Sequence, residues 1–188
     1  ALRDRHAGVR RNAVRIAAGT KIDVSCLEPL VNDPDSKVRL ELATTLGQYD
    51  SPQASAAIAR VAIGSSEDRY LLAAAMSSLN PRNVSDVLAA AIESSETGST
   101  VIISELIGQA VAMGDNDTIS RVVETVSRQQ NELEEEQRFE SFARILDALS
   151  IRKLSVGKLS ESARDSISQT TQQARTAAAS EKLTQLPQ

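Results

Sequence analysis

The 188-residue sequence predicts an all-α fold, an α-solenoid of stacked antiparallel helix hairpins that winds as a right-handed superhelix. Three observations support this prediction. Apolar residues recur with a period near 3.6 along nearly the whole chain. Short polar connections separate the apolar stretches, which makes consecutive helices antiparallel neighbours. A short motif also repeats about every 30 residues, and such repeats bury their apolar faces only against one another.

The internal repeat is clearest near the N-terminus. Val38 lies 29 positions after Val9, and Tyr70 lies 32 positions after Val38. These three residues occupy the same position in segments that align with one another. The aligned segments are residues 4–10 followed by Ala13-Val14, residues 33–39 followed by Leu42-Ala43, and residues 65–71 followed by Ala74-Ala75.

Turn and capping residues set the predicted helix boundaries. Residues 33–36 read Asp-Pro-Asp-Ser, and their short polar side chains accept hydrogen bonds from the first free N–H groups of a helix. Gly47 is expected to help close that helix, and Ser51-Pro52 is expected to start the next one. The predicted helices span 8–18, 23–32, 36–48, 51–64, 67–79, 83–95, 99–113, 116–129, 133–152 and 159–180.

The apolar stripes predict which residues are buried. Residues 101–111 are apolar over a wide face and should lie deep in the core. Met76, Met113 and the lone Cys26 are expected to pack inside. Further stripes are Ile119, Val122, Val123 and Val126; Phe139, Phe142, Ile145, Leu146 and Leu149; and Leu159, Ala163, Ile167, Ala174 and Ala178.

The character of the chain changes after Ile151. Residues 152–158 form a connection, and the segment that follows is rich in Ser, Thr, Gln and Ala until Pro187 ends it. The sequence therefore predicts a solenoid over residues 1–152. Residues 153–188 are predicted to be a connection and a C-terminal amphipathic helix, either docked on the last repeat or belonging to an incomplete one.

Composition narrows the function classes. Hydrophobic residues make up 41% of the chain and aromatic residues 2%, so small aliphatic side chains must build the core. The net charge of −4 argues against nucleic acid as the main partner, since phosphate binding favours a basic surface. A single cysteine forms no disulfide within the chain. No apolar run reaches the ~18–20 residues needed to span a bilayer.

The segment from Asp33 to Gly47 resembles a HEAT repeat, and its period is similar to the shorter, phycobilisome-lyase-like class of that family. In such repeats an aspartate sits in the turn and an arginine lies early in the following helix. The resemblance implies that Asp35 and Arg39 order adjacent hairpins, with Asp4 and Arg10 as their counterparts one repeat earlier.

Residues 1–80 also resemble the helical region of large planctomycete-type proteins of the membrane-bound dehydrogenase and cytochrome c kind. The similarity is carried by residues 2–15, by 38–43 with Leu46-Gly47, and by 73–79. Ala7 and Asn12 depart from that pattern, which often has Pro and His there. The resemblance implies a propeller before the helices, a haem domain after them, and an extracytoplasmic or membrane-associated parent. Because this chain has no Cys-x-x-Cys-His motif, haem binding is not carried over to it.

Basic and acidic clusters offer two candidate partner sites. Arg11 and Arg15 are four residues apart and share a helix face, so they could bind an acidic partner or phosphate. The alternative is a solvated face, or arginines paired with acids such as Asp4 and Glu41. The acidic run of residues 132–136 could bind a cation or a basic partner, or it could simply favour a helix N-terminus capped by Asn131.

Apparent catalytic motifs are weak. Ser150 and Lys153 match Ser-x-x-Lys, as do Ser155 and Lys158, but the accompanying triplets of serine acylases are missing. His6 lacks the several partners that a metal site requires, so a capping or surface role is expected. The sequence has no glycine-rich phosphate loop. We therefore expect no catalytic, cofactor-binding or metal-binding residue.

These inferences predict a non-catalytic helical-repeat scaffold that contacts a protein partner or the flanking domains of a larger redox protein. It should bind no nucleic acid and should not insert into a membrane. One alternative is a part of a dehydrogenase-associated or lyase-like enzyme that supplies substrate contacts. A weaker alternative is a helical repeat that binds nucleic acid.

Overall fold

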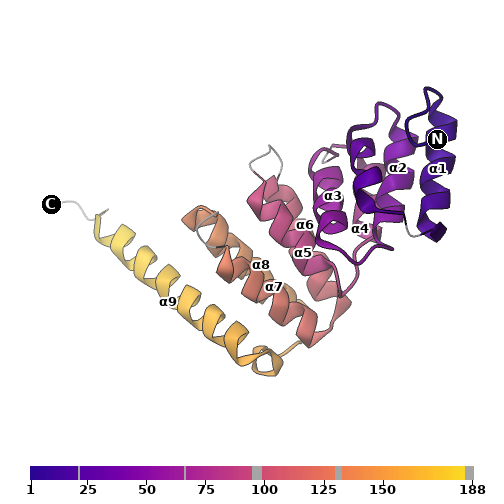
Figure 1. Cartoon of the computed structure of the whole chain (residues 1–188). Helices are drawn as coiled ribbons and strands as arrows, with labels where there is room; N and C mark the ends of the chain where they lie inside the picture. Colours follow the sequence, from indigo (N-terminus) through magenta and orange to yellow (C-terminus); the bar gives the residue numbers. More distant parts are fainter. Residues whose placement is uncertain (21, 66, 95–98, 130–132, 185–188) are drawn as a thin grey trace.

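The computed structural model describes residues 1–20, 22–65, 67–94, 99–129 and 133–184, with side chains as far as residue 179. These residues form an elongated stack of helices with no strand among them, and α1 and α9 lie at opposite ends of the stack (Figure 1). The all-α class and the repeated helix hairpin are as the sequence predicts.

The first half of the stack contains four α-helices and a pair of short 3-10 helices. The α-helices are α1 (Ala7–Thr20), α2 (Ser36–Leu46), α3 (Pro52–Ile63) and α4 (Arg69–Ser77), and the 3-10 helices are η1 (Val24–Cys26) and η2 (Glu28–Asn32). Ser51 caps α3 through its hydroxyl, which accepts a hydrogen bond from the N–H of Ala54 at 3.2 Å. That start is the one predicted from Ser51-Pro52.

The helix predicted over residues 23–32 is wrong, because the segment splits into η1 and η2. Asp23 caps η1, and Pro29 stands in the first turn of η2. A proline in the interior of an α-helix has no N–H for the ladder and collides with the preceding turn. Cys26 then lies at the exposed end of η1 rather than in the core, which corrects the prediction that it packs inside.

The second half contains longer helices. They are α5 (Val84–Glu93), α6 (Ser99–Met113), α7 (Asn116–Arg128), α8 (Glu135–Ile151) and α9 (Glu161–Thr184), with the 3-10 helix η3 (Val156–Lys158) before α9. Asp115 caps α7, and its carboxylate accepts from the N–H and the hydroxyl of Thr118 at 3.0 and 2.5 Å. Asn131, the predicted cap of α8, lies outside the described residues; the residue that precedes α8 is Glu134.

The helices form two layers. One layer runs through α1, α2 and α4, and then through α6 and α8, while the other runs through η2, α3, α5, α7 and α9. Each hairpin contributes one helix to each layer, so most helices pack on the second helix along in sequence. The first layer is thin between α4 and α6, whose backbones barely approach one another within the described residues. The second layer is continuous there, because α3 packs closely on α5.

A single aliphatic core lies between the layers. Leu42, Ile58, Leu88, Ile107 and Ile119 are each at most 1% exposed. Leu159, Ala163 and Ile167 extend this core onto α9, which packs on α7 and α8. The boundary at residue 152 between a solenoid and a C-terminal segment stays a prediction.

Some predicted core positions face solvent. Val101 is 58% exposed, although the rest of the wide apolar face of α6 is buried. Ala178 is exposed as well, as are the neighbouring described residues 175–179 of α9. Met76 and Met113 are partly buried and pack against the core, in agreement with the sequence analysis.

The third repeat was aligned one residue out of register. Asp68 caps α4 by accepting hydrogen bonds from the N–H groups of Tyr70 and Leu71 at 3.0 and 3.2 Å. Leu71 is 1% exposed and corresponds to Val38, whereas Tyr70 is 67% exposed and corresponds to no buried position. The capping aspartate, rather than the aromatic ring, marks the repeat.

Gly47 has a different role from the predicted one. It ends α2 with φ −63°, an ordinary helical value, so the helix end itself does not require glycine. A Cβ at this position would lie 2.5 Å from the backbone oxygen of Ser78, at the end of α4. The side chain of Asn80 donates to the Gly47 carbonyl at 3.4 Å, and the hydroxyl of Ser78 donates to that of Ala43 at 2.5 Å. Glycine is needed here because the next repeat approaches the backbone closely.

Candidate interaction surface

A charged contact joins the first two repeats. Arg10 on α1 donates two hydrogen bonds to the carboxylate of Asp33, which lies on the connection before α2. One comes from Nε at 2.6 Å and the other from a terminal nitrogen at 2.7 Å. The two side chains are only 12% and 3% exposed. Because the pair is bidentate and shielded from water, it fixes the orientation of one hairpin on the next.

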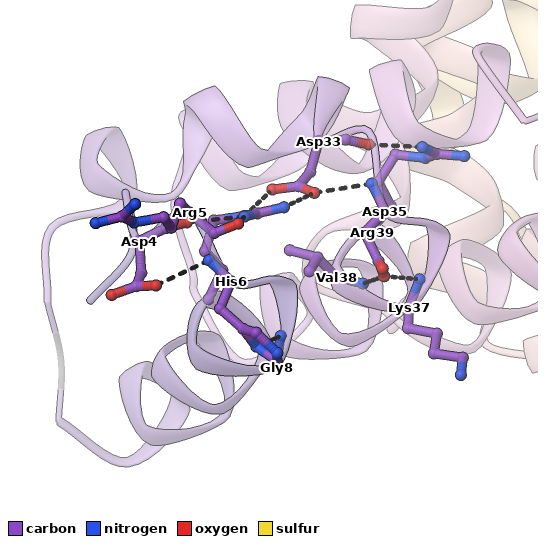
Figure 2. Close-up of polar contacts among 10 residues, drawn as sticks. Asp4, Arg5, His6, Gly8, Asp33, Asp35, Lys37, Val38 and Arg39 are labelled. Atoms are coloured by element: carbon purple, nitrogen blue, oxygen red, sulfur yellow. Dashed lines mark hydrogen bonds and ion pairs between the residues drawn. The ribbon is translucent and has the colours of Figure 1, made fainter.

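The same local geometry occurs at both turns. Asp33 accepts a hydrogen bond from the N–H of Asp35 at 2.9 Å, as Asp4 does from the N–H of His6 at 2.8 Å (Figure 2). Arg39 donates to the carbonyl of Asp33 at 2.6 Å, as Arg10 does to that of Asp4 at 2.8 Å. The two turns are therefore structural equivalents.

These contacts change the roles that the resemblance implied. Asp35 orders its own helix, since its carboxylate accepts from the N–H groups of Lys37 and Val38 at 2.9 and 3.2 Å. The carboxylate that joins two repeats belongs to Asp33, which the sequence analysis did not single out. The signal was present, because Asp33 and Asp4 occupy the same position in the aligned segments.

The electrostatics follow from these bonds. The Arg10 guanidinium holds the pKa of Asp33 below its usual range, against the opposing effect of burial. The pKa of Asp115 is also lowered, mainly by the hydroxyl of Thr118. Both aspartates are therefore charged at neutral pH, one as a link between repeats and the other as a helix cap.

The outer face of α1 is apolar and open. Ile16 is 64% exposed and Val9 is 41% exposed, whereas Val38, the counterpart of Val9, is fully buried. Beside Ile16 lies a groove of about 600 Å³ whose other walls are mainly Leu2, Ala13, Ala17 and Ile22. Arg3 also lines this groove. This end of the stack thus presents an aliphatic surface with a basic border.

The predicted partner-binding arginines lie on the same helix. Arg11 donates to Glu41 at 3.1 Å, which is one of the pairings that the sequence analysis weighed. Arg15 is exposed and donates to the side chain of Asn12 at 2.5 Å, so its contact stays within α1. Arg15 is thus the more available of the two for a partner, and its binding role stays a prediction.

The remaining candidates have local structural roles. His6 is exposed, and its Nδ1 accepts from the N–H of Gly8 at 3.1 Å, as a cap at the start of α1. Ser155 accepts from the N–H of Gly157 at 3.2 Å and so caps η3. Glu135 and Glu136 occupy the first turn of α8, where the helix dipole favours acids.

The described residues offer neither a metal-binding cluster nor a membrane-spanning helix. No group of three or more His, Cys, Asp or Glu side chains gathers there in a way that could hold a metal ion. None of the described helices combines the length and the apolar character that a membrane span requires.

Comparison with known proteins gave one match, to a family model that covers part of the chain. Residues 1–80 match the family model described as HEAT repeats, which supports a HEAT-repeat segment over that range. The comparisons with curated proteins and with solved structures each found no match. HEAT repeats generally act as protein-interaction scaffolds and are typically non-catalytic. The matched segment ends near the close of α4, just before the thin part of the first layer.

Proposed function

We propose that the chain is a non-catalytic scaffold whose first helix, α1, receives an amphipathic helix from a protein partner or from a flanking domain. The observation that carries the proposal is the exposed Ile16 beside an open apolar groove. On α2 and α4 the residues that correspond to Val9, namely Val38 and Leu71, are at most 1% exposed. An aliphatic stripe from a partner would cover α1 in the same way.

The charge around the groove defines the partner further. Arg3 lines the groove, and Arg15 is exposed next to Ile16. A partner helix with acidic residues beside its aliphatic stripe would complement this border. Such steering weakens with salt, whereas the apolar contact does not.

The test uses two synthetic helical peptides with the same leucine stripe, one flanked by glutamates and the other by lysines. Fluorescence anisotropy against the full chain should show binding of the acidic peptide and at least roughly tenfold weaker binding of the basic one. Ile16→Asp should abolish binding. Val101→Asp, a change at an equally exposed valine on α6, should leave it intact.

Two results would refute this proposal. One is that the acidic peptide does not bind at low salt. The other is that Ile16→Asp and Val101→Asp weaken binding to the same extent, because the peptide would then not be using α1.

The resemblance to the helical region of planctomycete-type proteins concerns the larger protein to which the chain would belong. On that resemblance alone, we propose that the chain connects the domains of a multidomain redox protein. The coding sequence on either side of residues 1–188 tests this, since it should encode a propeller upstream and a Cys-x-x-Cys-His haem motif downstream. A gene without either would remove the redox assignment and leave the scaffold untouched.

A further inference from the structure

Arg39 on α2 is the structural counterpart of Arg10 on α1, but its surroundings differ. Each arginine uses one terminal nitrogen to bind the carbonyl six residues earlier. Arg10 then uses its other two donors to hold the carboxylate of Asp33. Among the described residues, Arg39 forms no ion pair of this kind.

The sequence of the next repeat also differs. Asp33 stands two residues before the helix cap Asp35, whereas the residue two positions before the cap Asp68 is a serine, Ser66, which lies outside the described residues. Among the residues that the structure describes, Arg10 therefore holds a carboxylate, and Arg39 holds only a backbone carbonyl.

A pocket lies beside this arginine. It has a volume of about 270 Å³, and Arg39 and Arg60 line it from α2 and α3, together with Asn32, Ser65 and the Asp33 that Arg10 holds. Arg39 and Ser65 also line a wider pocket of about 570 Å³ with Glu67 and Asp68. In Figure 2 the Arg39 guanidinium reaches past Asp33, away from the Asp4 turn.

The charges favour a single carboxylate. Arg10 already balances Asp33, and Arg60 is held only by a surface pair with Glu28 at 3.0 Å, with both side chains 42% exposed. Such exposed pairs contribute little and exchange partners readily. Glu67 and Asp68 at the wider opening would repel a ligand with several negative charges.

We propose that the Arg39 pocket binds the side-chain carboxylate of an aspartate or glutamate from a partner protein, which takes the place that Asp33 has beside Arg10. The guanidinium fork would hold both carboxylate oxygens, and Arg60 would add a second positive charge. This inference deepens the proposed scaffold function by naming the chemistry of a second contact, and it rests on that function.

The experiment follows the arginine Nε–H signals of the ¹⁵N-labelled full chain by NMR while N-acetyl-aspartate N-methylamide is added. Three arginines are compared. The Arg39 signal should shift and saturate at a concentration roughly tenfold lower than that of Arg164, an exposed arginine on α9. The Arg10 signal should not move, because its carboxylate is already in place. The asparagine analogue should shift none of them.

Several results would overturn the assignment. Arg39 would be an ordinary surface arginine if its signal moved only as Arg164 does. A stronger response to inorganic phosphate than to the blocked aspartate would make the pocket a phosphate site. Arg39→Lys keeps the charge but removes the fork, so undiminished aspartate-induced shifts of the surrounding backbone amides would also contradict the proposal.

The α1 proposal and the Arg39 proposal can be refuted independently of each other. The helical peptides of the α1 test probe Ile16, and their binding does not depend on Arg39. Loss of peptide binding with a normal Arg39 response would remove the α1 partner, whereas a silent Arg39 with normal peptide binding would remove only the carboxylate pocket.

Discussion

The two halves of the stack join their repeats by different means. In residues 1–82 the repeats are linked by ion pairs, namely Arg10 with Asp33, Arg11 with Glu41, Arg60 with Glu28, and Arg82 with Asp50. Among the described residues of the second half, the one ion pair is the local Arg144–Glu140 contact within α8. In that half the repeats are linked by hydrogen bonds in which at most one partner is charged. Examples are the bonds from Gln129 to Glu93 and from Gln137 to Thr100.

The spacing of these links differs as well. Most contacts between repeats in the first half join residues 30 to 35 apart in sequence, whereas those in the second half join residues 36 to 40 apart. The aliphatic core nevertheless continues through both. Polar turn motifs therefore define the recognisable repeat, while shared aliphatic stripes define the architecture, which persists where the motifs end.

The largest effect should come from the core and should be the same in both halves. Leu42→Ala and Ile107→Ala each remove a fully buried side chain, so each should cost about 2–5 kcal/mol in the free energy of unfolding. Urea denaturation followed by circular dichroism measures it. A large loss in one half with a small loss in the other would show that the two halves do not depend equally on their aliphatic stripes.

The next effect should be confined to the first half. Asp33→Asn removes the charged partner of Arg10 and should cost about 1–3 kcal/mol at neutral pH. Because Arg10 lowers the folded-state pKa of Asp33, the wild-type contribution is complete above the unfolded value near 4 and disappears as pH falls through the lower folded value. The difference between the two proteins should therefore shrink on acidification. A difference that is constant down to pH 2 would contradict the ion-pair interpretation.

The aspartates that cap helices should contribute equally to stability in the two halves of the stack. Asp35 and Asp115 each accept hydrogen bonds at the start of their helices, so Asp35→Ala and Asp115→Ala should each cost about 0.5–2 kcal/mol. Thermal and urea unfolding provide the measurement. Serine at either position keeps an acceptor and should recover most of the loss.

The smallest effect on stability is expected at Glu135, in the acidic run of residues 132–136. Glu135 is exposed in the first turn of α8, and Glu135→Ala should cost well under 1 kcal/mol. The same unfolding assay applies, with Leu42→Ala as the reference. Comparable losses at these two sites would mean that the inward and outward faces are wrongly assigned.

Helical periodicity was sufficient to predict most elements, because every helix must bury one stripe. It failed at residues 23–32, where Pro29 removes a backbone donor, and at Val101, which is exposed at the N-terminal end of an otherwise buried apolar face. The register of the third repeat failed because Tyr70 resembled a core residue, while the capping role of Asp68 depends on backbone geometry.

The candidate surface was predictable only in part. The basic character of α1 and the pairing of Arg11 with Glu41 follow from the sequence. The bond between Arg10 and Asp33 links residues 23 apart across two hairpins, and its partner can be identified only once the hairpins are stacked. The lack of a carboxylate for Arg39 becomes visible only by comparing the two arginines in space.

The thin contact between α4 and α6 has a mechanical consequence. A two-layered rod bends most easily where one of its layers is interrupted, and here the halves are joined mainly by the packing of α3 and α6 against α5. A pull on the two ends would therefore flex the rod about this joint before it disturbed the shared hydrophobic core. The angle between whatever is attached to the two ends is set where α3 packs on α5.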